Sequence, residues 1–170
     1  EHYLYIHPIG QVLLNNSKLF LSKRVVYSFA GYAKEQLKKL DNKSSQSFGE
    51  DYTGIGRRNR YAAAHNKIGK HMAHLIRLYY MCFDILENQK IITYRNKEHD
   101  LLMNIRNGEY LDKNQQPISS FYDLLSELEK RLEYDEKNTS LPETPDYQRI
   151  NEFRMFVNEK IVTGKIEKEN

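Results

Sequence analysis

The feature that most constrains the fold is a long amphipathic segment in the middle of the chain, from Asn59 to Asn88. Its apolar residues recur every three or four positions, which places them along one side of an α-helix. They are Tyr61, Ile68, Met72, Leu75, Tyr79, Cys82 and Leu86. This stripe predicts a long helix as the strongest element of a folded, mainly α-helical domain.

Four other segments carry helix signals, mostly as capping residues or helical spacing of apolar positions. The first begins at Ser22, and another should stop at the left-handed position offered by Asn107-Gly108. A Ser120–Asp123 pair has the form of a capping box. The segments are Ser22 to about Leu40, Lys97 to Arg106, Ser120 to about Tyr134, and a helix capped by Asp146 that runs to about Val162. We therefore expect a mainly α fold, a bundle of about five helices.

The remaining segments lack helical spacing. Residues 3–21 predict short extended pieces, namely Tyr3–His7, Val12–Leu14 and Leu19–Leu21, separated by turn residues. We interpret residues 1–21 as a remnant of, or connector from, a preceding domain, and residues 22–162 as a helical C-terminal domain. Residues 41–58 are rich in Ser, Gly and charge and predict a mobile loop, while residues 163–170 predict a frayed tail.

Composition excludes several classes of protein. The chain has 170 residues, the usual size of one domain, and a net charge of only +3, so any nucleic-acid binding must come from clustered charge. Cys82 is the single cysteine, which excludes an internal disulfide, and its place on the apolar stripe predicts a buried, unreactive thiol. Because no apolar run approaches the roughly 20 residues of a membrane span, we expect a cytoplasmic protein.

The main functional signal is a row of basic residues on the long helix, opposite its apolar stripe. No Asp or Glu occurs between Arg60 and Cys82. A row of one charge sign suits a phosphate backbone or a nucleotide, although a solvated helix face would look the same. The candidate binding residues are Lys67, Lys70, His71, His74 and Arg77, with Arg57, Arg58 and Arg60 as a mobile electrostatic arm before them.

Other motifs are weaker. Gly54-Ile55-Gly56 lacks the preceding strand and the third glycine of a nucleotide-binding fingerprint. His71 and His74 together with His99-Asp100 suggest the ligands of a metal-dependent phosphohydrolase, with Asp123 or Asp146 nominally completing the set. The carboxylates near the end of the Ser120 helix, Glu127, Glu129, Glu133, Asp135 and Glu136, are typical of solvated surface. We find no credible catalytic residue and assign no metal ligand.

Several short segments of the sequence match those of a known family and occur in the same order along the chain. They are Ser28–Ala33 with Gln36-Leu37, Lys70–Leu78 (KHMAHLIRL), Leu101 with Ile105–Tyr110 (IRNGEY), and Leu141-Pro142, Pro145–Tyr147 and Ile150-Asn151. Over most of residues 3–155 the chain resembles the C-terminal half of the predicted nucleotidyltransferases of the DNA polymerase β superfamily, the RlaP/YcgL type of bacteria and phages. The resemblance adds Arg106 to the candidate binding residues.

In that family an N-terminal domain carries the chemistry, with a Gly-Ser motif for the triphosphate and an Asp-x-Asp motif for the metals. This sequence contains neither motif. The resemblance therefore implies a missing N-terminal catalytic domain as the chain's partner, with Mg²⁺ and a nucleoside triphosphate bound by the full-length protein and RNA or another nucleic acid as acceptor. The fragment alone should be inactive. A non-catalytic interaction or regulatory module, with the basic row docking an acidic protein, is the alternative.

Overall fold

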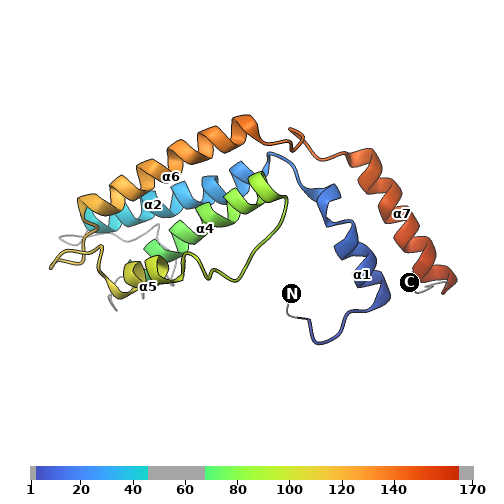
Figure 1. Cartoon of the computed structure of the whole chain (residues 1–170), viewed down its shortest axis with the longest axis horizontal. Coiled ribbons are helices and arrows are strands. Elements are labelled where there is room, and N and C mark those ends of the chain that lie inside the picture. The colour runs from blue at the N-terminus through green and yellow to red at the C-terminus, as the bar shows by residue number, and fades with distance from the viewer. Residues whose placement is uncertain (1–2, 46–67, 165–170) are drawn as a thin grey trace. The chain divides into compact units, whose positions relative to one another are not determined.

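The computed structural model describes residues 3–45 and 68–164, and within these ranges the regular secondary structure is helical. The α-helices are α1 (Pro8–Asn15), α2 (Gly31–Ser45), α4 (Ile68–Asn88), α5 (His99–Asn107), α6 (Ser119–Asn138) and α7 (Tyr147–Thr163), as Figure 1 shows. A 3₁₀ turn covers Ser17–Phe20 and a π-helical turn covers Val26–Ala30. The mainly α expectation is confirmed, with six α-helices in the described residues where the sequence predicts about five.

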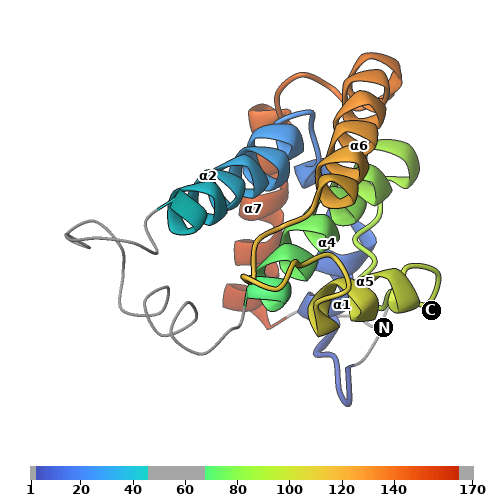
Figure 2. The same cartoon turned by 90° about the vertical axis from the view of Figure 1, so that its left-hand side faces the viewer.

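The chain divides into two compact units, and α4 is the central helix of the larger one, Val25–Thr139. α2, α5 and α6 all pack on α4, and Figures 1 and 2 show α4 between them. The described stripe residues from Met72 to Leu86 are at most 2% exposed. The predicted stripe and the predicted end at Asn88 are thus confirmed, whereas Tyr61 and the predicted start lie outside the described residues.

The helix predicted from Ser22 is continuous, but its first turn is not α-helical. Its first turn is the π-helical turn at Val26–Ala30, and α2 follows directly and extends to Ser45, beyond the predicted end at Leu40. The small side chains of Ala30 and Ala33 are buried where this segment packs on α4. The predicted loop at 41–58 is therefore helical up to Ser45, and the rest of it lies outside the described residues.

The backbones of α4 and of the end of α5 approach each other closely at Gly69. A Cβ atom on Gly69 would lie 2.7 Å from the carbonyl oxygens of both Ile105 and Arg106. Only glycine permits this contact without a backbone shift. α5 ends as predicted, with Gly108 in the left-handed conformation at φ 95°.

The start of α6 corrects the predicted capping box. The helix is capped by Ile118 without a side-chain hydrogen bond, so Ser119 and Ser120 lie inside its first turn. The backbone N–H of Phe121 donates to the Ile118 carbonyl at 3.0 Å, and the Phe121 side chain is fully buried. Packing of Phe121 sets this boundary in place of the Ser120–Asp123 pair.

The smaller unit contains residues 1–24 and 140–170, with α1, the 3₁₀ turn and α7 in its described part. The extended pieces predicted at Val12–Leu14 and Leu19–Leu21 are wrong, because both segments are helical. Pro8 occupies the first turn of α1, where its missing N–H costs nothing, and His7 Nδ1 accepts a hydrogen bond from the Ile9 N–H at 3.3 Å. Whether residues 1–21 belong to a preceding domain stays a prediction.

The second segment of the smaller unit follows the sequence prediction closely. Asp146 caps α7, its Oδ1 accepting from the Arg149 N–H at 3.0 Å. The helix ends at Thr163 with Gly164 in the left-handed conformation, and the rest of the predicted tail lies outside the described residues. No helix within residues 3–45 and 68–164 combines the length and apolar character needed to cross a membrane.

Candidate phosphate-binding site

The predicted basic row is present on the described part of α4. Lys70, His74 and Arg77 are exposed along the side opposite the buried stripe. Their spacing of four and three residues keeps them on one face, because an α-helix turns once every 3.6 residues. His71 is partly buried and does not line the site described below.

This face of α4 forms one wall of a pocket of about 490 Å³. α5 forms a second wall, and the segment that connects the two helices contributes the rest. The described lining residues are Lys70, Ala73, His74 and Arg77 of α4, Thr93, Tyr94, Arg95 and Asn96 of the connecting segment, and His99, Leu102, Met103 and Arg106 of α5. No Asp or Glu is among them. The pocket thus gathers four of the predicted binding residues, Lys70, His74, Arg77 and Arg106.

Lys70 and Arg106 are brought together by the contact at Gly69. Gly69 precedes Lys70 on α4, and its Cα faces the carbonyl oxygen of Arg106. Neither the Lys70 ammonium nor the Arg106 guanidinium has a hydrogen bond or ion pair with another residue in the described part of the chain. Two cations without internal partners are therefore available to an anion at this end of the pocket.

Arg77 ties α4 to the connecting segment. Its Nη2 donates to the carbonyl oxygen of Thr93 at 2.9 Å. A guanidinium carries five N–H donors, so this bond leaves others for a ligand. The bond also holds the side chain in place, which lowers the entropy that phosphate binding would cost.

Arg95 is a pocket residue that the sequence did not reveal. Its side chain is buried and donates to the Asp84 carboxylate and, at 2.8 Å, to the carbonyl oxygen of Ile92. Glu98 Oε2 lies 3.9 Å from Arg95 Nη1. Because two carboxylates compensate its charge, Arg95 fixes the connecting segment and adds little net charge to the pocket. Its pairing with Asp84 spans eleven residues and leaves no local signal.

His74 differs from its neighbours in protonation. Partial desolvation of its ring, and secondarily the charge of Arg77, lower its pKa below the usual 6.5. The imidazole is accordingly neutral near pH 7 and offers hydrogen bonds without a charge. The ring of Tyr32 on α2 approaches it edge-on at 6.4 Å between centroids.

The structure does not assemble the phosphohydrolase alternative. Within the two described ranges, no group of three His, Cys, Asp or Glu side chains is close enough to hold a metal ion. His99 Nδ1 lies 3.0 Å from Asp100 Oδ1, so these exposed neighbours contact each other. Arg57, Arg58, Arg60, Lys67 and the Gly54-Ile55-Gly56 motif lie outside the described residues.

Two other expectations concern reactive groups in the larger unit. Cys82 is fully buried, and burial raises its pKa to about 12, which confirms the unreactive thiol. Asp135 is buried, contrary to the expectation of a solvated carboxylate. It is 8% exposed, and its Oδ2 lies 3.5 Å from Arg131 Nε. Burial, with the nearby Glu87 carboxylate, raises the pKa of Asp135 to about 6.

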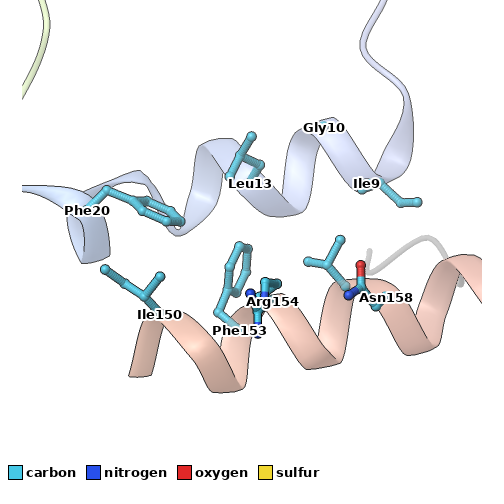
Figure 3. Close-up of a pocket in the computed structure, with 9 residues that line it drawn as sticks. Ile9, Gly10, Leu13, Phe20, Ile150, Phe153, Arg154 and Asn158 are labelled. Carbon is cyan, nitrogen blue, oxygen red and sulfur yellow. The ribbon is translucent and has the colours of Figure 1, made fainter. Parts of the chain in front are cut away.

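A second hollow, of about 320 Å³, lies within the smaller unit between the α1 segment and α7. Phe153 points from α7 toward α1 in Figure 3, and the other lining residues are mostly apolar. Arg154, the single cation among its described lining residues, donates to Asn151 Oδ1 at 2.7 Å. This groove offers apolar contact and little to hold a phosphate.

Comparison with protein-family models, curated proteins and solved structures finds no match for this chain.

Proposed function

We propose that this chain is the helical, substrate-binding C-terminal part of a nucleotidyltransferase and that the α4–α5 pocket binds substrate phosphate. The observation that carries the proposal is the convergence of Lys70, His74, Arg77 and Arg106 on one pocket. These residues come from two separate segments that carry the resemblance, Lys70–Leu78 and Ile105–Tyr110. No pattern within either segment requires them to meet.

The electrostatics of the larger unit support phosphate as the ligand. Three other basic side chains of this unit are paired with carboxylates: Arg131 with Glu87, Arg95 with Asp84, and Lys34 with Glu129 at 3.9 Å. Lys70 and Arg106 have no such partner within the described residues. Unpaired cations that share a pocket repel one another, and a bound anion removes that repulsion.

The catalytic step belongs to the preceding domain that the resemblance implies. That domain would bind Mg²⁺ and the nucleoside triphosphate and transfer the nucleotidyl group to an acceptor, RNA or another nucleic acid. This chain has no Gly-Ser or Asp-x-Asp motif, and no carboxylate lines the described part of the pocket. Its own residues would bind and orient substrate without taking part in the chemistry.

The test is binding of the 170-residue chain to labelled tRNA, single-stranded RNA and DNA over a series of salt concentrations. We expect binding that weakens steeply with salt and is lost in a Lys70→Glu/Arg77→Glu variant. Lys130→Glu is the matched control, because Lys130 is exposed on α6 and does not line the pocket.

Three results would contradict the proposal. The first is an absence of binding at low salt, and the second is an equal loss of binding in the Lys130 control. The third is binding of an acidic protein without any nucleic-acid binding, which would favour the interaction module instead.

A further inference from the structure

The pocket has an uneven distribution of charge along its length. Lys70 and Arg77 are seven residues apart on α4, which is two helical turns or about 10 Å. Between them on α4 lie Ala73 and His74, and His74 is the residue whose pKa is lowered toward the neutral form. The α4 wall is therefore cationic at two ends and uncharged in its middle.

The α5 wall has a matching arrangement. Arg106 stands at one end, and Leu102 and Met103 lie one turn earlier on the helix. The contact at Gly69 fixes which ends correspond, because it places the last turn of α5 against the start of the described part of α4. Lys70 and Arg106 thus share one end of the pocket, beside an apolar middle formed by Ala73, Leu102 and Met103.

The second end is built around Arg77. Its hydrogen bond to the Thr93 carbonyl places it at the connecting segment, which lines the pocket as far as Asn96. Arg95 belongs to the same segment, but Asp84 and Glu98 compensate its charge. Arg77 is therefore the cation that this end offers to a ligand, and Tyr94 adds an exposed aromatic ring.

Two cationic ends with an apolar middle suit a ligand that carries two separate phosphates around a flat, less polar group. One nucleoside of a single-stranded nucleic acid has this form, with a phosphate on each side of the sugar and a base that packs on apolar or aromatic side chains. The pocket volume of about 490 Å³ is within the ordinary range for sites of small ligands. A nucleoside triphosphate differs, because its phosphates are contiguous and would occupy one end only.

We infer that the α4–α5 pocket holds one nucleoside of a single-stranded acceptor between two phosphates, one at Lys70 and Arg106 and the other at Arg77. This inference rests on the proposed function and narrows it, because it assigns the pocket to the acceptor strand and not to the nucleoside triphosphate.

The experiment compares adenosine 3′,5′-bisphosphate, ATP and AMP as ligands of the 170-residue chain by calorimetric titration. The bisphosphate and ATP carry similar total charge and differ in where the phosphates lie, so the pair separates geometry from net charge. We expect the bisphosphate to bind about tenfold more tightly than AMP, the gain of one charge-assisted phosphate contact, and also more tightly than ATP.

The variants assign the two ends. Lys70→Ala and Arg77→Ala should each reduce bisphosphate affinity about tenfold, to the level of AMP, whereas Lys130→Ala should leave it unchanged. Thermal unfolding of each variant checks that the fold is kept, as we expect for exposed positions.

Two outcomes would overturn the inference and differ in their reach. Binding of ATP as tight as that of the bisphosphate would end the acceptor assignment while leaving a nucleotide pocket and the proposed function in place. Absence of binding to every nucleotide, together with absence of salt-dependent nucleic-acid binding, would end both.

Discussion

The two units of this chain are stabilised in different ways. In the unit Val25–Thr139, ten residues of α4 are buried, and α6 adds four buried apolar side chains beginning with Phe121. In the other unit, neither α1 nor α7 contains a buried residue. The candidate site therefore lies on the unit with a substantial apolar core, as a precisely spaced set of charges requires.

The smaller unit depends on contacts that remain partly in water. Phe20 meets Phe153 edge-on at 5.9 Å between ring centroids, and Lys23 pairs with Glu143 at 2.5 Å. Arg24 donates to the Tyr147 hydroxyl at 2.8 Å. Exposed ion pairs contribute at most about 1 kcal/mol each, so this unit should open locally at a lower free energy than the other.

The largest predicted effect compares one aromatic residue from each unit. Phe121→Ala leaves a cavity in the core and should lower the free energy of unfolding of the larger unit by about 3 to 5 kcal/mol. Phe153→Ala removes a partly exposed ring from an aromatic pair and should lower the free energy of unfolding of the smaller unit by about 1 kcal/mol. Chemical denaturation measures the first, and amide hydrogen exchange in α7 compared with α4 measures the second.

Equal losses from the two substitutions would contradict the difference between the units. So would exchange of α7 amides as slow as that of α4 amides in the unsubstituted chain, because it would show a well-protected α7 despite the absence of buried residues in that helix.

The next effect tests the contact that positions the site. Gly69→Ala places a methyl group against the carbonyl oxygens of Ile105 and Arg106 and should destabilise the larger unit by about 1 to 3 kcal/mol. The control is Gly31→Ala, since a Cβ there meets nothing within 4 Å and the backbone is helical. That change should stabilise the unit by roughly 0.5 to 1 kcal/mol, the helix propensity difference. Opposite signs of the two changes in melting temperature are the expected result, and equal signs would contradict it.

The smallest effect is a dependence of stability on pH. The pKa of Asp135 is raised from 3.8 to about 6 by burial, with Glu87 nearby and Arg131 opposing the shift. The folded chain thus binds this proton more tightly than the unfolded chain. Stability should rise as pH falls through 6, by about 1 kcal/mol between roughly pH 7.5 and pH 5. Asp135→Asn should remove this rise, whereas Asp123→Asn, at an exposed position on the same helix, should keep it.

The sequence predicts several helices of both units well because their signals are local. The apolar stripe of α4, the stop at Gly108 and the cap at Asp146 each follow from residues within a turn or two of one another. The same holds for Lys70, His74 and Arg77, whose shared face is a matter of spacing alone. These parts required no knowledge of tertiary packing.

The errors arose where tertiary contacts or weak local signals decide the structure. Val12–Leu14 has apolar residues that fit either a short strand or a helix, and Pro8, which is typical of turns, can also begin a helix. The charged residues around Asp135 predict an exposed carboxylate, yet it packs beside Arg131 and Glu87. Arg95 could not be assigned to the site, since its partner Asp84 is on another element and the pocket forms only when α5 packs on α4.

The contact at Gly69 has a consequence for how such a chain can change over time. The separation of α4 and α5 at the Lys70 end of the pocket depends on the absence of a side chain at Gly69. A Cβ atom there would push the two helices apart. Stability and the proposed phosphate binding are therefore subject to the same constraint at this one position. A sequence that lost this glycine would need to rebuild the end of α5 before it could regain either property.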